Sequence, residues 1–136
     1  MSNNYFLDKF TPRFSDTDAL GHINNTMVPV WFEGARDEVF KWFTPTLNLA
    51  EWRLILAKID VSFHGQMYYG KAMEVRTYIG RIGSSSFDVY QELWQDDELK
   101  SSGTAVMVHF DYQEQKALKI PEEITRKMTE YLKANA

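Results

Sequence analysis

Residues 13–25 read RFSDTDALGHINN, so two carboxylates, a glycine, an imidazole and two amides fall within ten positions. The apolar stretch TMVPVWFEGARDEVFKWF follows directly. The first turn of a helix leaves backbone N–H groups unpaired and carries the positive end of the helix dipole. A carboxylate beside such a turn can act on a carbonyl group that these N–H groups polarise. The junction therefore predicts chemistry on a carbonyl group at a strand-to-helix connection.

The two aspartates of this junction have different expected roles. The carboxylate of Asp18 can act on a substrate, or it can bind nearby backbone N–H groups as an ordinary loop residue. From the residues alone, the loop role is the more common one. Asp16 lies two residues earlier, where it would share a side with Asp18 in an extended chain, and two close carboxylates raise one pKa. We expect Asp16 to be structural, bound to a backbone N–H group or an arginine.

The other polar residues of the junction suit a helix start. Gly21 is expected to supply a backbone conformation that other residues resist. The imidazole of His22 can orient water or hydrogen-bond an aspartate, and it can equally be structural. Asn24 and Asn25 are good helix caps. Capping and carbonyl binding are compatible, because both place N–H groups at the same end of the helix.

Length and composition limit the function further. A chain of 136 residues with 44% hydrophobic and 15% aromatic residues predicts one globular domain over residues 1–136. The net charge of −4 argues against a dedicated nucleic-acid surface. The absence of cysteine excludes disulfides, thiolate metal sites and a cysteine nucleophile. No apolar signal region and no run of about 18 apolar residues occur. We expect a cytoplasmic protein without a membrane or nucleic-acid partner.

Apolar spacing predicts the elements that hold the junction. Residues 5–14 alternate loosely and predict a strand, with Pro12 marking an edge or an end. After the junction loop, a long helix is expected from a cap at Asn25 or Thr26 to about Phe43. Apolar residues cover most of its circumference, so this helix is expected to be buried and wrapped by a sheet.

Four further strands and a short helix are expected in the rest of the chain. Apolar and polar residues alternate around residues 55–63, 73–79, 87–93 and 106–110. Short links between these runs predict an antiparallel meander. Pro121 then opens a final helix. The order predicts an α+β fold, in which one curved antiparallel sheet wraps around one long helix.

This order of elements, with the motif D-x-D-x-x-G-H-I-N-N at residues 16–25, resembles the hotdog-fold acyl-CoA thioesterases, and most closely the 4-hydroxybenzoyl-CoA thioesterase-like group. The resemblance covers nearly the whole chain. It includes R-I-G-S-S-S at residues 81–86 and S-G-T-A-V-M-V at residues 102–108. It implies a hotdog fold, an acyl-CoA substrate, no cofactor, and a homodimer or homotetramer.

The resemblance also implies roles for individual residues. Asp18 would be the catalytic carboxylate, as a nucleophile or a general base, with His22 and Asn25 beside it. Backbone N–H groups around Asn24, Asn25 and Thr26 would hold the thioester carbonyl as an oxyanion site. The active site would lie at a dimer interface. Contacts to coenzyme A would come from the turn that carries Arg81, Ser84, Ser85 and Ser86.

Histidine and aromatic residues elsewhere are mainly expected to be structural. His64 and His109 lie whole strands away from the junction and do not show zinc-ligand spacing, so no metal site is expected. The aromatic residues of the long helix are mostly assigned to the core. With the resemblance, some of Trp31, Phe32 and Phe63 are candidates for an acyl pocket.

Two other functions stay open at this point. A hotdog enoyl-CoA hydratase or dehydratase would need a positioned acid/base pair, commonly Asp with His, to move a proton at carbon. A non-catalytic acyl-CoA binding module would bind the ester tightly without turnover. Hydration of crotonyl-CoA distinguishes the first from a thioesterase, and turnover distinguishes the second.

Overall fold

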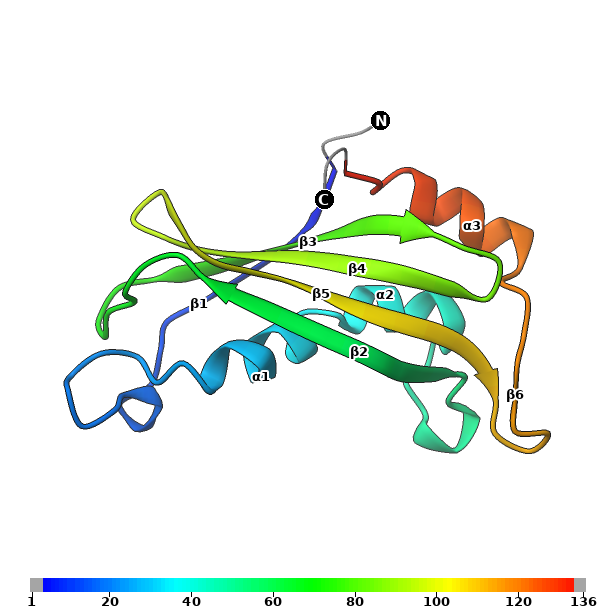
Figure 1. Cartoon of the computed structure of the whole chain (residues 1–136), viewed down its shortest axis with the longest axis horizontal. Coiled ribbons are helices and arrows are strands. Elements are labelled where there is room, and N and C mark those ends of the chain that lie inside the picture. The colour runs from blue at the N-terminus through cyan, green and yellow to red at the C-terminus, as the bar shows by residue number, and fades with distance from the viewer. Residues whose placement is uncertain (1–3, 134–136) are drawn as a thin grey trace.

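A computed structural model describes residues 4–133 as one curved antiparallel sheet with helices against it (Figure 1). The strands are β1 (Phe6–Phe10), β2 (Leu54–Phe63), β3 (Met73–Ile82), β4 (Ser86–Gln95), β5 (Glu98–Asp111) and β6 (Lys116–Ala117). The helices are α1 (Met27–Gly34), α2 (Asp37–Phe43) and α3 (Glu122–Thr129), with 3₁₀ turns at Phe14–Asp16 and Leu49–Glu51. The strand order is β1-β3-β4-β5-β2, and β6 pairs with β5.

Alternating side chains explain why the central segments form strands. On β3, Met73, Val75 and Ile79 are buried, because alternate residues of a strand share one face. β4 continues this buried face, with Leu93 opposite Val75 in the register. The four predicted strand regions are confirmed, although β5 begins at Glu98 rather than near residue 106.

The meander expected for the later strands is wrong for β2. Strands β3, β4 and β5 do follow one another, but β2 pairs with β5 and β3 pairs with β1. The link between β2 and β3 covers residues 64–72, which can extend over about 30 Å. Three strand spacings amount to about 14 Å, so this link can cross the sheet. β2 therefore lies at one edge and β1 at the other.

The first strand is shorter than predicted. β1 ends at Phe10, and Phe14 lies in a 3₁₀ turn with an exposure of 75%. Pro12 follows the end of β1, which is an edge strand, as its inability to donate a hydrogen bond predicts.

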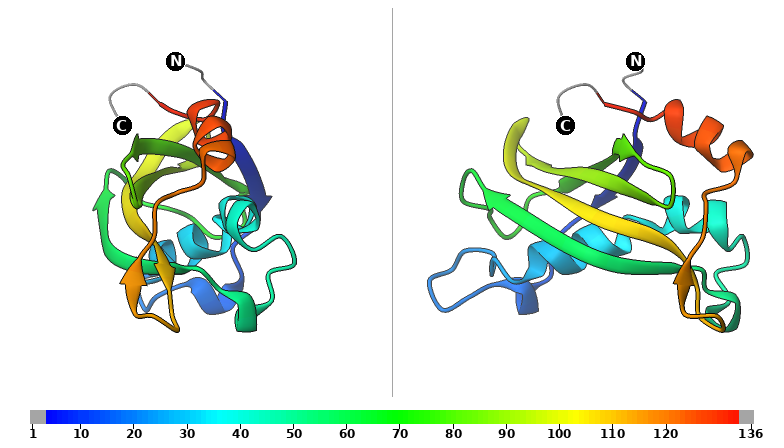
Figure 2. Two further views of the ribbon diagram at one scale, coloured as in Figure 1. Left: turned by 90° about the vertical axis from the view of Figure 1, so that its right-hand side faces the viewer. Right: turned by 45° about the vertical axis from the view of Figure 1, so that its right-hand side comes forward.

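The single long helix predicted from the sequence is wrong, because α1 and α2 are separated at Ala35 and Arg36. Gly34 is a poor helix former at the end of α1. Only one face of the pair is buried, and Val30 on the other face is 57% exposed. The two helices lie on the concave side of the sheet (Figure 2). The buried face consists of Val28, Phe32, Arg36, Val39 and Phe43.

Two side chains of the sheet explain the break. Nε2 of Gln91 on β4 donates to the Phe32 carbonyl at 2.8 Å, and the Thr77 hydroxyl on β3 donates to the Ala35 carbonyl at 3.3 Å. With these carbonyls engaged, the N–H group of Arg36 donates to the carbonyl three residues back, at 3.1 Å. The ladder of bonds four residues back is therefore interrupted where the helix crosses the middle of the sheet.

The last helix covers the part of β3 that β1 does not reach. Pro121 precedes α3 as predicted, and the chain then returns to β3. Ile79 N donates to Tyr131 O at 2.9 Å, and Lys133 N donates to Ile79 O at 2.9 Å. Within residues 4–133, no helix has the length and apolar character needed to cross a membrane.

Candidate active site

A cavity of about 500 Å³ opens at the end of the sheet where β2 ends. One wall is the loop between β1 and α1, which contributes Asp18, His22 and Asn25. The other wall is residues 63–67. Both segments lie on the same side of the molecule, beyond the arrowhead of β2 (Figure 1). Three of the residues predicted to form the catalytic group therefore line one cavity.

Asp16 connects the two ends of this loop. Its buried carboxylate accepts a hydrogen bond from Arg13 N at 2.8 Å and forms an ion pair with Arg13 Nη2 at 3.0 Å. Asn24 N donates to Asp16 O at 2.7 Å, which closes the base of the loop. Burial raises the pKa of Asp16, but the hydrogen bonds and charge of Arg13 outweigh burial and hold the pKa below its ordinary value. These contacts with the backbone and side chain of Arg13 confirm the structural role predicted for Asp16.

Asp18 is exposed and sits in the turn above Asp16. Its Oδ1 accepts hydrogen bonds from Leu20 N at 2.8 Å and from His22 N at 3.2 Å. Gly21 has a φ of +81°, and this left-handed conformation is one that other residues resist, as predicted. Among the described residues, nothing donates a hydrogen bond to Oδ2 of Asp18. One oxygen thus holds the loop, and the other is available to a ligand.

Two of the three backbone N–H groups predicted as oxyanion donors are already hydrogen-bonded within the chain. Asn24 N is already used by Asp16 O, and Thr26 N donates to Asn24 Oδ1 at 3.0 Å. The amides of Asn24 and Thr26 therefore cannot serve as oxyanion donors without giving up these bonds. Asn25 N has no acceptor within residues 4–133, and Asn25 lines the cavity. Of the three predicted donors, Asn25 N is the one that is free to bind a ligand in the described part of the chain.

His22 joins the two walls of the cavity. It forms a β-bridge with Tyr68, and Ile23 N donates to Met67 O at 3.1 Å. The rings of His22 and Tyr68 lie edge to face at 5.9 Å. The hydrogen bonds between His22 and Asp18 come from the His22 main chain, including Asp18 N to His22 O at 2.8 Å. His22 therefore positions Asp18 through its backbone.

His64 lines the cavity, a position that the sequence did not reveal. It follows β2 directly, and its Nε2 lies 2.8 Å from Ser102 Oγ. Only the pairing of β2 with β5 brings Ser102 beside it, and that pairing was not predicted. His109 is a buried sheet residue, as expected, with Nδ1 at 3.1 Å from Lys119 O.

The residues predicted to contact coenzyme A lie at the opposite end of the sheet. The turn at residues 83–85 stands near the start of β2, whereas the cavity lies where β2 ends. Arg81 Nη2 donates to Asp88 Oδ1 at 2.9 Å and to Ser86 Oγ at 3.1 Å. Within one chain, the segment that holds Arg81, Ser84, Ser85 and Ser86 does not meet Asp18.

An apolar groove of about 540 Å³ lies at this opposite end, beside the start of β2. Phe40 of α2 and Trp52 pack edge to face at 5.2 Å in its wall. Glu33, Arg36 and Asp37 contribute charged side chains from the helix break. The apolar part of the groove consists of Phe40, Leu47, Leu49, Trp52, Leu54, Ile55, Leu56, Met107 and Tyr112.

The aromatic candidates for an acyl pocket are divided between cavity and core. Phe63 lines the cavity and is 50% exposed. Phe32 is buried, and Trp31 packs against Phe10 with ring centroids 4.9 Å apart.

Among residues 4–133, no three His, Asp or Glu side chains lie close enough together to hold a metal ion.

Comparison with known proteins agrees with this fold. The chain is similar to a predicted thioesterase from Bacillus stearothermophilus, with 41% identity and a TM-score of 0.93 over 98% of this chain and 100% of that one. It is similar in fold to a thioesterase from Thermus thermophilus that was crystallised with coenzyme A and Zn, with 24% identity and a TM-score of 0.79 over 90% and 95% of the two chains.

A curated relative is the uncharacterized protein YsmA of Bacillus subtilis (strain 168), 26% identical over 119 residues, which are 87% of this chain and 81% of YsmA. The model of the thioesterase-like superfamily matches residues 12–128, a span that includes the cavity loop, the whole sheet from β2 to β6 and most of α3. The chain therefore belongs to the thioesterase-like superfamily and is an enzyme of the thioester hydrolase class.

Proposed function

We propose that this enzyme hydrolyses an acyl-CoA thioester to a free acid and coenzyme A. The observation that carries the proposal is that Asp18, with one unpaired carboxylate oxygen, and Asn25, with an unpaired N–H group, line one cavity at the start of α1. The carboxylate supplies a nucleophile or a base, and the N–H group polarises the carbonyl. The leaving thiol has a pKa of about 8.5, so it departs without a strong acid.

Two routes are consistent with this arrangement. In the general-base route, Asp18 takes a proton from water while the water oxygen bonds to the carbonyl carbon. The oxyanion accepts a hydrogen bond from Asn25 N, the C–S bond breaks, and the proton is returned to the coenzyme A thiolate. In the nucleophilic route, Asp18 itself bonds to the carbonyl carbon and displaces coenzyme A. Water then hydrolyses the mixed anhydride and restores the carboxylate.

The choice of coenzyme A as acyl carrier is supported by the fold relative from Thermus thermophilus, which was crystallised with it. In this chain, the turn at residues 81–86 is the proposed contact for the coenzyme. Its hydroxyl groups and Arg81 can bind phosphate or pantetheine oxygens, once the Asp88 ion pair is exchanged for the ligand.

We further propose a homodimer, or a tetramer built from it, that pairs along β2. Within the described chain β2 has one unpaired edge, and Ile55, Leu56, Ile59 and Phe63 remain exposed on this strand. A long apolar edge of this kind is a template for another strand. A second copy of the chain offers the same strand under two-fold symmetry.

Antiparallel pairing of two β2 strands would bring the end of one beside the start of the other. The Asp18 cavity of one protomer would then face the apolar groove and the 81–86 turn of its partner. A single chain keeps these parts about 30 Å apart, the length of β2. The dimer would thus supply the acyl pocket and the coenzyme contacts that the cavity lacks.

The test is thiol release from a panel of acyl-CoAs, followed with a thiol reagent. The chain contains no cysteine, so the enzyme adds no background signal. Asp18→Asn keeps an oxygen for the loop hydrogen bonds but cannot act as a base or nucleophile. We expect turnover to fall by about 100-fold or more in this variant.

Asp111→Asn is the matched control. Asp111 Oδ1 also accepts two backbone N–H groups, from Gln113 at 2.9 Å and Glu114 at 3.1 Å, but it lies outside the cavity. Its substitution should leave turnover within about twofold. Full activity in Asp18→Asn would overturn the assignment of the carboxylate. Tight binding of acyl-CoA without turnover in the wild type would favour a binding module, and hydration of crotonyl-CoA would favour a hydratase.

A further inference from the structure

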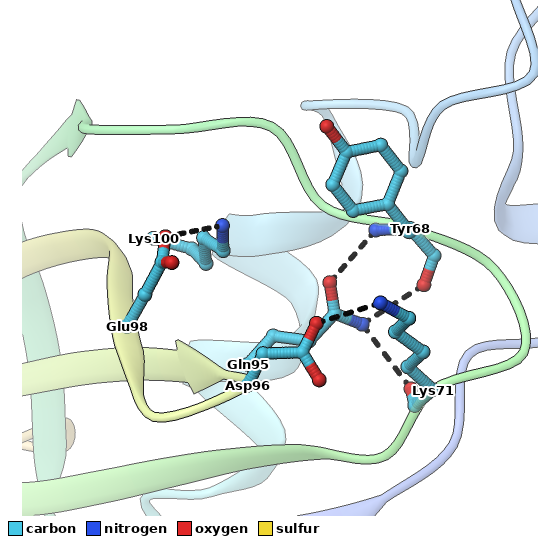
Figure 3. Close-up of polar contacts among 6 residues, drawn as sticks. All are labelled: Tyr68, Lys71, Gln95, Asp96, Glu98 and Lys100. Atoms are coloured by element: carbon cyan, nitrogen blue, oxygen red, sulfur yellow. Dashed lines mark hydrogen bonds and ion pairs between the residues drawn. The ribbon is translucent and has the colours of Figure 1, made fainter.

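Apart from Phe63 at the end of β2, the second wall of the Asp18 cavity consists of residues 64–67, which lie in the link between β2 and β3. One side chain from the sheet holds this link in place. Figure 3 shows the Gln95 carboxamide at the end of β4, directed at the main chain of Tyr68 and Lys71. Gln95 is 1% exposed, so its carboxamide is buried, and it binds the main chain of two residues, Tyr68 and Lys71, that are themselves exposed.

The carboxamide of Gln95 is fully used by this link. Its Oε1 accepts a hydrogen bond from Tyr68 N at 2.8 Å. Its Nε2 donates to Tyr68 O at 2.8 Å and to Lys71 O at 3.2 Å. One acceptor and two donors are required at this point, which is the set that a primary amide offers and a carboxylate does not.

A short series of contacts leads from Gln95 to the proposed catalytic carboxylate. Tyr68, whose backbone N–H and C=O groups both bind Gln95, forms the β-bridge with His22. His22 N donates to Asp18 Oδ1 at 3.2 Å, and Asp18 N donates to His22 O at 2.8 Å. A shift of Tyr68 would therefore move the turn that aims Asp18.

Two lysines hold the Tyr68 ring in the same cluster. Lys71 Nζ and Lys100 Nζ lie 5.8 and 5.9 Å from the ring centroid, within the range of cation–π attraction. Lys71 pairs with Asp96 at 2.8 Å, and Lys100 pairs with Glu98 at 3.1 Å (Figure 3). Of these side chains, Gln95 alone holds the link by its main chain, through three hydrogen bonds, which makes Gln95 the main anchor.

We infer that Gln95 is a positioning residue for the thioesterase reaction, acting on Asp18 through Tyr68 and His22. This inference rests on the proposed function. Gln95 does not line the cavity, so it touches neither the substrate nor the reacting atoms. Its effect should appear mainly in kcat, because misplacing a catalytic group by about 1 Å can cost about 100-fold in rate.

Gln91 offers a matched control on the same strand. It is also 1% exposed, and its carboxamide also makes three side-chain contacts, but these hold Phe32, Thr77 and Arg36 at the helix break. A Gln→Glu change removes the amide donors at either position. At residue 91 the new carboxylate meets the Arg36 guanidinium, whose Nη1 donates to Gln91 Oε1 at 3.2 Å. At residue 95 it would meet two carbonyl oxygens instead.

The experiment compares wild type, Asp18→Asn, Gln95→Glu and Gln91→Glu for thiol release, at a temperature where each is folded. For Gln95→Glu we expect kcat to fall by about 10- to 100-fold, with KM changed less than about threefold. Gln91→Glu should retain kcat within about threefold, whatever its loss of thermal stability.

The dependence of kcat on pH distinguishes a positioning role from a loss of stability. A buried carboxyl group facing carbonyls is protonated more readily, and the protonated form recovers one donor. The kcat of Gln95→Glu relative to wild type should therefore rise as the pH falls. Gln91→Glu should show no such rise, because Arg36 keeps its carboxylate ionised.

The outcomes separate this inference from the proposed function. Absence of thiol release in the wild type would remove the proposed function, and survival of thiol release in Asp18→Asn would overturn the assignment of the carboxylate and, with it, the role of Gln95. A different result overturns only the role of Gln95. In that case the wild type releases thiol and Asp18→Asn does not, while Gln95→Glu keeps the wild-type kcat and its kcat relative to wild type does not change with pH. If Gln95→Glu does not fold, Gln95→Met replaces it, which avoids a buried charge. If neither folds, Gln95 holds the fold as a whole and the positioning role is overturned.

Discussion

The two ends of strand β2 differ in the side chains that surround them. The end at Phe63 opens into a cavity of about 500 Å³ with a carboxylate, two imidazoles and a free N–H group. The end at Leu54 opens into the apolar groove of about 540 Å³, where Phe40 and Trp52 form the wall. The first is held together by hydrogen bonds and an ion pair, and the second by aromatic and aliphatic contacts.

Under the proposed function, neither end alone combines the residues for catalysis with the apolar groove. The cavity holds the residues proposed for catalysis in a mixed polar and apolar lining, whereas the lining of the groove is mainly apolar and includes no residue proposed for catalysis. Because the unpaired edge of β2 connects the two ends, two-fold pairing along it would join each cavity to the groove of the other protomer. The comparison therefore predicts that activity depends on the dimer.

The largest expected effect comes from breaking this edge. Ile59 lies in the middle of β2 and is 46% exposed. Ile59→Lys places a charge in each copy near the two-fold axis, which opposes pairing. We expect a monomer by analytical ultracentrifugation and a fall in thiol release of about 100-fold, since the cavity and the groove would no longer meet.

Leu7→Lys is the control for this prediction. Leu7 is an exposed apolar residue, 50% exposed, on the opposite edge strand β1. The same substitution there should change neither mass nor turnover. A fully active monomer of Ile59→Lys would mean that one chain contains a complete site, and the contrast between the two ends would lose its functional meaning.

A smaller effect is expected from changing the groove alone. Trp52→Ala removes a large apolar side chain from its wall while leaving the cavity intact. We expect kcat/KM for aromatic and medium-chain acyl-CoAs to fall by about 10-fold, which is about 1.4 kcal/mol, and kcat/KM for acetyl-CoA to change by less than about threefold.

Trp94→Ala controls for the loss of a tryptophan. Trp94 packs over Arg76, with the guanidinium carbon 4.3 Å from the ring centroid, away from both the cavity and the groove. Its substitution should lower all acyl-CoA rates equally or not at all. An equal loss across acyl chains in Trp52→Ala would place the acyl pocket elsewhere.

The cavity end was the better predicted of the two. The spacing of Asp16, Asp18, Gly21 and His22 in one loop is local, so a sequence motif can reveal it. The roles of Asp16 as an anchor and of Gly21 as a left-handed residue followed from their chemistry alone. What the local pattern could not reveal is that the Asp16 carbonyl and the Asn24 side chain already accept hydrogen bonds from the N–H groups of Asn24 and Thr26.

Non-local features were not predictable in the same way. The pairing of β2 with β5 depends on how far the link at 64–72 can reach, and both His64 and the groove depend on that pairing. The helix break depends on Thr77 and Gln91, which lie on strands far along the chain. The apolar spacing of a helix in the sequence does not reveal which distant side chains will hydrogen-bond its carbonyl groups.

Acid should loosen the cavity end before the groove end. The pKa of Asp16 is lowered in the folded state, so the unfolded chain binds more protons as the pH falls. Its contribution is present above the unfolded pKa of about 3.9 and is lost as the pH falls through the lowered value. We expect the urea midpoint of wild type to exceed that of Asp16→Asn above about pH 5, with the difference shrinking towards zero in stronger acid.

Amide exchange measured across the same pH range would locate this effect. Protection at residues 16–24 should decline first, while residues 54–56 at the groove keep theirs. If the two ends lose protection together, the ion pair of Arg13 and Asp16 does not set the stability of the cavity loop.

The smallest effect concerns the turns at the two ends. The β4–β5 turn, next to Gln95 at the cavity end, places Asp96 and Asp97 at φ of 55° and 59°, a region that glycine adopts at lower cost. Asp97→Gly keeps the Lys71–Asp96 ion pair and should raise the free energy of unfolding by about 0.5 kcal/mol.

None of residues 83–85 in the turn at the groove end has a positive φ. Ser85→Gly should therefore lower the free energy of unfolding by about 0.5–1 kcal/mol, because glycine loses more entropy on folding. The opposite signs, measured by urea denaturation, distinguish local backbone strain at the cavity end from a general response to glycine; a loss of stability in both variants would show that no such strain is stored beside the site.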